Sequence, residues 1–502
     1  MDLINSLAAW WFRKRLSDLH LFALNPVDTQ EGQLSMLVER AKFTQFGKKY
    51  KFEQIKSIND FQQKVPLQNY ASLLPYIEQM MQGKPDILWV DKVKWFAKSS
   101  GTGSGKSKFI PVSEEGLELN HFQAGKDVIA YYLHNHPNSK LLKGKTLKLG
   151  GSKKLLKFDE AYVGDLSAIM IDNMPYWSNV ITVPEKKTAL LSDWEIKIDR
   201  ILSEAFPTQL VGLAGVPSWM MMLLKEALRK SNKKNVLDIW PELEVFFHGG
   251  VSFLPYKKAY QELFPSKNFN YMEVYNASEG FFALQDQAGS DELLLLLNHG
   301  VFYEFIPMNT YNGLDSETII PLRKVEKDVN YAMVISTNSG LWRYIIGDTV
   351  KFTSTRPYRI KITGRTKHFI NVFGEEVIIE NADKAIQNAC KQTNSSVLDY
   401  TVAPIFMETD KKGAHEWLIE FEVEPADFEQ FKKILDKELQ NINSDYEAKR
   451  YLNMTLDFPL IHKARKGLFY DWLKQKGKLG GQHKVPRLSN SRKILEELLQ
   501  LF

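Results

Sequence analysis

The spacing of apolar residues divides the chain into an early helical part and a later part rich in strands. In residues 5–51, apolar side chains recur every three or four positions, as at Leu34, Leu37 and Val38, which predicts amphipathic helices. Residues 55–82 continue this pattern, with a break at Pro66. Helices followed by strands that end in polar, glycine-bearing turns predict a large mixed α/β domain with ligands bound at strand ends.

The middle of the chain alternates between the two periodicities. Helical spacing predicts further helices over 114–133, 189–206 and 217–230. Short apolar runs bounded by Gly, Asn or Asp predict strands over 87–90, 93–97, 109–112, 243–247, 270–274, 293–297, 301–306, 331–336 and 341–346. Residues 140–157 are basic and contain glycine, so a solvated hairpin or loop is favoured there over a binding patch.

A change of pattern near residue 364 predicts a second, smaller domain. An alternating strand over 359–365 contains Gly364, and the pattern then restarts. It gives strands over 369–372, 398–407 and 416–423, with helices over 381–392, 426–439 and from Ser489. We interpret residues 1–362 as a large α/β domain, 363–367 as a hinge and 368–502 as a small, mobile α+β domain, which is an ordinary domain size.

Composition narrows the class of protein without naming a function. The chain has 502 residues, of which 44% are hydrophobic and 25% charged, as in soluble globular proteins. Its net charge of +5 is spread over too long a chain to indicate nucleic-acid binding. Cys390 is the single cysteine, which excludes an internal disulfide and a zinc site built from several cysteines. The apolar residues at the start of the chain are not arranged as they are in a signal peptide. No apolar run is long enough to span a bilayer. We expect a cytoplasmic monomer without nucleic-acid or membrane partners.

The run from Lys98 to Lys108 has no residue that could build a core. It consists of glycine, serine, threonine and lysine, in the order KSSGTGSGKSK. Glycines let backbone N–H groups converge on an anion, while hydroxyls and lysines add donors and charge, so a polyphosphate loop is predicted. It is not a P-loop, because Ser100 stands where the first glycine is required and Pro111 disfavours a following helix.

The loop resembles the phosphate loop of the acyl acid amido synthetases of the Gretchen Hagen family, a branch of the acyl-adenylate-forming enzymes. The resemblance rests on Ser99–Lys108 followed by Ile110 and Pro111. It implies two domains of the adenylate-forming type, a mobile C-terminal domain, and the cofactors ATP and Mg²⁺. The loop residues that it assigns to ATP are Ser99, Ser100, Gly101, Thr102, Gly103, Ser104, Gly105, Lys106 and Lys108.

Further motifs follow in the family's order. Tyr275-Asn-Ala-Ser-Glu279 is similar to the aromatic-x-x-Ser/Thr-Glu motif, which implies that Tyr275 stacks on adenine, Ser278 contacts ATP and Glu279 holds Mg²⁺. Residues 342–348 resemble the Tyr-Arg-x-Gly-Asp motif, in which Asp348 binds the ribose hydroxyls. The role of Arg343 stays open, because Tyr344 stands at or beside the family's arginine.

The C-terminal part carries the remaining resemblance. Thr363-Gly364-Arg365 stands where the superfamily has its hinge, with Gly364 as the pivot and Arg365 near ATP. Residues 482–487 resemble the C-terminal lysine loop, in which Lys484 reaches the α-phosphate and the carboxylate during adenylation. This implies that Lys484 and Glu279 are the catalytic residues.

The region that would bind the acid carries the weakest signal. Met220 and Met221 lie on the helix over 217–230, where a methionine run indicates either core or an adaptable pocket. His248 and Gly249 either shape a pocket beside adenine or form a structural turn. Residues 121–132 are a further apolar candidate.

Taken together, the residues and the resemblance imply a ligase. We expect ATP-dependent adenylation of a carboxylic acid, followed by transfer of the acyl group to an amine, an amino acid, to form an amide. One alternative is an acyl-CoA ligase, which differs in its thiol acceptor. Another is a nucleotide-binding sensor without catalysis, against which Glu279, Asp348 and Lys484 count.

Overall fold

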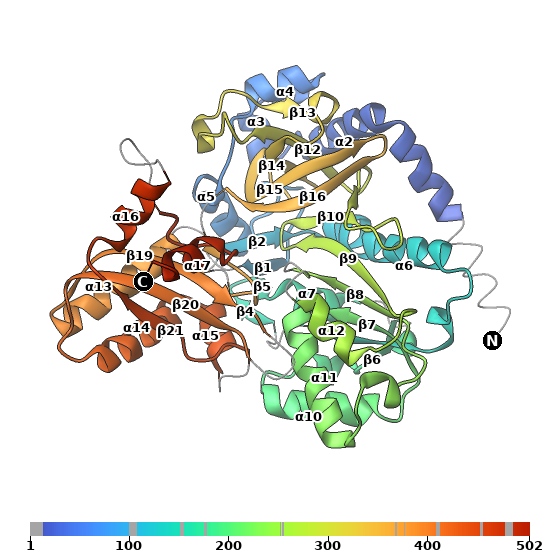
Figure 1. Ribbon diagram of the computed structural model, residues 1–502. Coiled ribbons are helices and arrows are strands. Elements are labelled where there is room, and N and C mark those ends of the chain that lie inside the picture. The colour runs from blue at the N-terminus through green and yellow to red at the C-terminus, as the bar shows by residue number, and fades with distance from the viewer. Residues whose placement is uncertain are drawn as a thin grey trace.

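Two parts of different size make up the structure, a computed structural model (Figure 1). It describes residues 14–99, 108–150, 155–174, 178–250, 253, 256–366, 369–375, 377–407, 412–451, 455–476 and 485–501. The body extends to the end of β16 (Tyr358–Arg365), and the C-terminal part lies on the left in Figure 1. The mixed α/β class expected from the sequence is confirmed.

A twelve-stranded mixed sheet organises the body. Its order is β13-β12-β14-β15-β16-β11-β10-β9-β8-β7-β3-β6. The strands not bounded elsewhere are β3 (Lys145–Leu149), β6 (Thr182–Val183), β7 (Leu210–Gly215), β8 (Val245–Gly249), β9 (Asn270–Ala277), β10 (Gly280–Leu284), β11 (Leu293–Leu295), β12 (Val301–Pro307), β13 (Ile320–Pro321), β14 (Asn330–Thr337) and β15 (Tyr344–Thr355).

The five strands from β9 to β6 are parallel, and helices on both faces cover them. The chain runs from β7 through α11 (Pro217–Ser231) to β8, then through α12 (Lys257–Leu263) to β9. These helices and α10 (Trp194–Ala205) pack on one face, and α6 (Gln123–Asn135) packs on the other (Figure 1). Parallel connections bring the carboxyl ends of β7, β8 and β9 to one edge, where ligands bind in such sheets.

Helices predicted from the early part of the chain are confirmed from residue 14 onward, and residues 5–13 of that prediction lie outside the described residues. They are a helix over 14–24, α2 (Pro26–Ala41), α3 (Gln45–Lys49), α4 (Ile58–Lys64) and α5 (Tyr70–Met81). The remaining helices of the body are α7 (Leu166–Asn173), α8 (Ser178–Ile181), α9 (Lys186–Ala189) and the π-helix Gly116–Phe122, which precedes α6. No helix among the described residues has the length and apolar character needed to cross a membrane.

Two local expectations are wrong. Residues 145–149 are not a solvated loop but strand β3, which pairs with β6 and β7, because Leu147 and Leu149 are buried and the long stem of Lys148 between them tolerates partial burial. Residues 87–90 are not a strand but a bend. Leu88 and Trp89 are buried there, and the Leu88 carbonyl accepts a hydrogen bond from Nε1 of Trp342 at 2.9 Å.

The glycine loop joins two paired strands. β1 (Trp95–Ser99) and β2 (Lys108–Val112) are antiparallel, in a small sheet of order β2-β1-β5-β4 with β4 (Leu156–Phe158) and β5 (Ala161–Gly164). A P-loop leads into a helix, whereas this loop leads into a strand. The strand predicted over 109–112 is therefore confirmed.

The C-terminal part has two sheets of its own, β17-β18 and β19-β20-β21, and packs against the body. Its strands are β17 (Phe369–Ile370), β18 (Val377–Ile378), β19 (Ser396–Ile405), β20 (Ala414–Val423) and β21 (Leu460–Ala464). Its helices are α13 (Ile379–Thr393), α14 (Phe428–Ile442), α15 (Ser444–Arg450), α16 (Leu468–Gln475) and α17 (Lys493–Leu499). One apolar cluster joins its core to α11 and α12, and the hydroxyl of Tyr256 donates to the Val372 carbonyl at 2.7 Å.

Candidate active site

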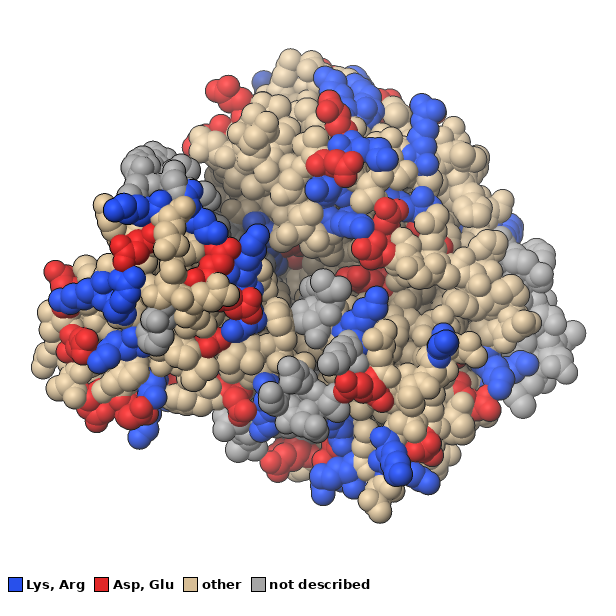
Figure 2. Space-filling view, in the orientation of Figure 1, with Lys and Arg blue, Asp and Glu red and all other residues tan. Residues whose placement is uncertain are grey.

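A cavity of about 1450 Å³ lies where the body meets the C-terminal part. Its walls come from the ends of β8 and β9, from β15 and β16, and from C-terminal residues 371–374, 445–449 and 490–492. Figure 2 shows the surface hollowed between the two parts. The sequence-predicted residues that line it are Ser99, Tyr275, Ser278, Glu279, Asp348, Gly364, Arg365 and His248.

Glu279 lies in the tight turn between β9 and β10, at the edge where the parallel strands end. Burial raises the pKa of its carboxyl to about 7, and the nearby Lys108 opposes this rise. Lys108 begins β2, and its Nζ lies 3.5 Å from the hydroxyl of Tyr344. Ionising a buried carboxyl that has little positive charge nearby costs free energy. A bound cation would offset that cost.

Mg²⁺ fits this arrangement. It is usually held by one or two carboxylates together with substrate phosphates, and a carboxyl facing a cavity suits that mode. Among the described residues, no group of three His, Cys, Asp or Glu side chains could hold a metal ion. A cation at Glu279 would therefore depend on the phosphates of a bound nucleotide for its other ligands.

Asp348 is fixed by two side chains, Tyr275 from β9 and Arg365 from the neighbouring strand β16. The hydroxyl of Tyr275 donates to Oδ2 of Asp348 at 2.6 Å, and Nε of Arg365 donates to Oδ1 at 2.7 Å. Arg365 lies directly opposite Asp348 in the β15–β16 pair. The ring of Tyr275 packs edge-on against Phe282, so in this structure the tyrosine orients the carboxylate, and stacking on adenine stays a prediction.

The turn that carries Glu279 is held from behind by Asn120, which the sequence did not single out, and by His121, which begins the candidate segment 121–132. Asn120, on the π-helix, accepts from the Phe281 N–H at 2.7 Å and donates to the Phe281 carbonyl at 3.1 Å. The next residue, His121, contacts the amide oxygen of Asn276 at 3.2 Å through Nδ1, and Asn276 pairs with Phe281 across the hairpin. The π-helix thus grips the hairpin at the base of its turn.

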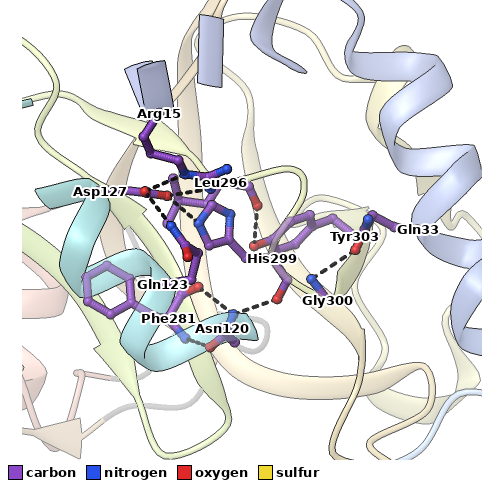
Figure 3. A network of polar contacts seen from close by, with 10 residues as sticks. All are labelled: Arg15, Gln33, Asn120, Gln123, Asp127, Phe281, Leu296, His299, Gly300 and Tyr303. Carbon is purple, nitrogen blue, oxygen red and sulfur yellow. Dashed lines mark hydrogen bonds and ion pairs between the residues drawn. The ribbon is translucent and has the colours of Figure 1, made fainter. Parts of the chain in front are cut away.

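A buried polar network supports Asn120 in turn (Figure 3). The carboxylate of Asp127 on α6 contacts Nε2 of His299 at 2.7 Å and Nε of Arg15 at 2.8 Å. The backbone carbonyl of His299 accepts from the Asn120 amide at 2.9 Å. Asp127 and His299 are fully buried, so loss of either partner would leave an unsatisfied polar group in the core.

The structure assigns several candidates to packing. Met220 and Met221 are fully buried in the core and do not line the cavity. A Cβ at Gly249 would lie 2.5 Å from the Val274 carbonyl, so this glycine permits close pairing of β8 and β9. Of the apolar candidate segment 121–132, Tyr132 reaches the cavity, while the rest packs in the interior.

His248 keeps a place on the cavity wall. Its ring stacks on Phe253 with centroids 4.1 Å apart, and burial lowers its pKa to about 3, so it is neutral at physiological pH. Its Nδ1 has no hydrogen-bond partner among the described residues. A neutral imidazole with a free ring nitrogen can receive a polar group of a ligand.

The open question about Arg343 is answered by its contacts. Its guanidinium forms a buried ion pair with Glu304, with Nε to Oε2 at 2.9 Å, and donates to the carbonyls of Gln62 and Val65. Arg343 is a structural residue. The following residue, Tyr344, is fully buried, and Nζ of Lys108 lies 3.5 Å from its hydroxyl.

Parts of two predicted motifs lie outside the described residues. These are Ser100, Gly101, Thr102, Gly103, Ser104, Gly105 and Lys106 of the glycine loop, and Lys484 of the C-terminal loop. The chain that follows Lys484 is fixed beside β19. The Val402 N–H donates to the Arg487 carbonyl at 2.8 Å, and the Ser489 N–H donates to the Val402 carbonyl at 3.1 Å.

Comparison with known proteins supplies the family. Three family models match the chain in order: the GH3 family N-terminal domain over residues 15–269, the central domain over 294–365 and the C-terminal domain over 380–493. Indole-3-acetic acid-amido synthetase GH3.4 of Arabidopsis thaliana is 22% identical over 571 residues, covering 97% of this chain and 93% of the relative.

Two further matches agree with this result. The 4-substituted benzoates-glutamate ligase GH3.12 of Arabidopsis thaliana is 20% identical over 568 residues, covering 97% of this chain and 96% of the relative. The solved structure of GH3.15 acyl acid amido synthetase superposes with a TM-score of 0.62 at 16% identity, covering 97% of this chain and 95% of that one. The resemblance inferred from the motifs is confirmed, and the chain belongs to the GH3 family.

Proposed function

We propose that the protein adenylates a carboxylic acid with ATP and then transfers the acyl group to the amine of an amino acid. The observation that carries the proposal is the convergence of Glu279, Asp348 and the base of the glycine loop on one cavity. Family membership supports it, because the relatives named above are amido synthetases and an acid–glutamate ligase.

In the first step, a carboxylate oxygen of the acid attacks the α-phosphorus of ATP. A new O–P bond forms, the bond to the bridging oxygen breaks, and pyrophosphate leaves. Asp348 would position the ribose, and Lys108 and the loop would neutralise phosphate charge. Glu279 would hold Mg²⁺, which supplies further neutralisation of the triphosphate. Lys484 is proposed to contact the α-phosphate and the attacking carboxylate.

In the second step, the amine nitrogen attacks the acyl carbonyl carbon. The C–N bond forms, the C–O bond to AMP breaks, and the nitrogen releases a proton to water. His248, which is neutral and has a free ring nitrogen, lines the same cavity. The products are an amide and AMP.

We also propose residues 1–362 and 368–502 as two domains that rotate about Gly364 between these steps. Gly364 has φ +144°, a backbone conformation that residues with a side chain rarely adopt. In this structure β16 is paired with β15 as far as Arg365. The guanidinium of Arg365 donates a hydrogen bond to one carboxylate oxygen of Asp348. Rotation at Gly364 would move Arg365 and release that oxygen for a ribose hydroxyl.

The first test is exchange of labelled pyrophosphate into ATP with a panel of carboxylic acids. Signal above background with at least one acid is expected, and background with every acid contradicts the proposal. Glu279→Gln is expected to lower exchange about 100-fold, since it removes a carboxylate from the triphosphate site. Glu273→Gln is the matched control, because this cavity carboxyl also has a pKa raised to about 7 by burial.

The acceptor is identified with an acid-by-amine matrix in which AMP release and product mass are measured. Amide products support the proposal. A thioester with coenzyme A, without amide, indicates an acyl-CoA ligase. ATP binding without pyrophosphate release indicates a sensor.

A further inference from the structure

One of the basic residues that line the cavity, Lys449, belongs to the C-terminal part. Lys449 lies on α15, lines the cavity and is 7% exposed. Its Nζ lies over the ring of Trp219 on α11, 4.0 Å from the centroid. The ammonium therefore lies where the two parts of the protein meet. The helix that carries it, α15, is not one of the elements that carry Glu279 and Asp348.

A lysine buried to this degree is normally paired with a carboxylate. Among the described residues no carboxylate lies within 4 Å of Nζ of Lys449, and its partner is the face of Trp219. Asp445, Glu375 and Asp165 act on it only at longer range, and burial lowers its pKa to about 8. At pH 7 the group remains mostly protonated, so the cavity contains a desolvated positive charge with no anion in contact among the described residues.

The backbone of the C-terminal part also lies close to this ammonium. Gly374, in the turn after β17, has φ +86°, and a Cβ at this position would lie 3.3 Å from Cε and 3.4 Å from Nζ of Lys449. The end of the lysine therefore lies against both the Trp219 ring and the turn that contains Gly374. A held, desolvated cation binds an anionic group more strongly than a mobile surface lysine does.

We propose that Lys449 binds the carboxylate of the amino-acid acceptor and thereby selects anionic amines. The inference rests on the proposed function, because it names how the second substrate is recognised. The amine must be uncharged to attack, so the carboxylate is the charge that an amino acid retains in the cavity. It would enter against the wall formed by the C-terminal part, while ATP occupies the wall formed by the body. Lys449 keeps its proton throughout and takes no part in bond making.

The test compares two acceptors that differ only in this charge. One is the amino acid that gives the most AMP in the acid-by-amine matrix, and the other is the α-carboxamide of that amino acid. The variants are Lys449→Met, Lys449→Arg and the matched control Lys463→Met. Lys463 is an exposed lysine of β21, paired with Glu424 and outside the cavity lining.

For Lys449→Met, kcat/KM for the amino acid is expected to fall about 10- to 100-fold, as for loss of a charge-assisted hydrogen bond, mainly through KM. The value for the carboxamide is expected to change less than threefold, and pyrophosphate exchange is expected to stay within twofold of the unmodified protein. Lys449→Arg should recover most of the preference for the amino acid, and Lys463→Met should behave as the unmodified protein.

Equal losses with both acceptors would overturn the inference, because they indicate a structural role at the contact with Trp219. A loss of pyrophosphate exchange would also overturn it and place Lys449 in adenylation. Unchanged kinetics would overturn it as well. If the unmodified protein shows no exchange with any acid, the proposed function itself fails, and that result is distinct from the others.

Discussion

Glu279→Gln should make the protein more stable at alkaline pH although it disables the proposed adenylation. Burial raises the pKa of Glu279 from 4.5 to about 7, so the folded state binds more protons than the unfolded state between these values. The stability contributed by this group is therefore present below pH 4.5 and is lost as pH rises through 7. A shift of about 2.5 units corresponds to roughly 3 kcal/mol at most.

Thermal unfolding of both proteins from pH 4.5 to pH 8.5 measures this effect. At pH 8, Glu279→Gln is expected to melt a few degrees above the unmodified protein, since glutamine is not ionised in the desolvated turn. At pH 4.5 the ionisation difference disappears. Glu273→Gln should show the same dependence, because burial raises the pKa of Glu273 to about 7 as well. A Glu279→Gln protein that melts at or below the unmodified protein at every pH would refute the reasoning.

Addition of ATP with Mg²⁺ then distinguishes the role of Glu279 from that of Glu273. ATP with Mg²⁺ should raise Tm of the unmodified protein and of Glu273→Gln by similar amounts, because binding to the folded state stabilises it. The increase for Glu279→Gln should be clearly smaller, since the variant lacks the carboxylate proposed to hold the cation. Equal increases in all three proteins would show that Glu279 takes no part in nucleotide binding.

Three further substitutions test the supporting structure. Arg343→Met leaves Glu304 buried without its cation and should lower the free energy of unfolding by about 3–5 kcal/mol in denaturant titrations, with the activity of the folded protein preserved. Tyr275→Phe retains the ring but removes the hydrogen bond to Asp348, so KM for ATP should rise about tenfold with little change in kcat. Asn120→Ala removes the side-chain partner of three backbone groups and should lower kcat more than it changes KM for ATP, measured by pyrophosphate exchange.

The strands that carry the site residues could be predicted, because each site motif stands at or near the end of a short apolar run. Tyr275–Glu279 comprises the end of strand β9 and the turn after it, and Asp348 stands early in β15, so the apolar pattern located the strands and the polar residues marked the site. The mixed α/β class followed from the same pattern. The lysine-rich strand β3 was missed because its charges masked a two-residue alternation of buried leucines.

The residues that hold the site could not be found in this way. Asn120 and Phe281 are 161 positions apart, and nothing in the sequence near Asn120 marks a π-helix. Arg343 lies inside a motif that resembles a nucleotide site, yet its partners are a glutamate 39 residues away and two backbone carbonyls. Only the tertiary structure shows that this arginine faces the core, whereas Asp348, five residues later, lines the cavity.

The cavity has two walls with different origins, and this division bears on how substrate choice can vary. The ends of β9 and β15 supply Glu279 and Asp348, and the sheet fixes both through neighbouring strands. The opposite wall is formed by the C-terminal part, where Lys449 lies on a short helix outside that sheet. On the proposed function, a substitution on α15 would change the charge offered to the second substrate without altering any strand that carries Glu279 or Asp348. Acceptor preference could then change independently of adenylation, and the Lys449 variants measure that independence directly.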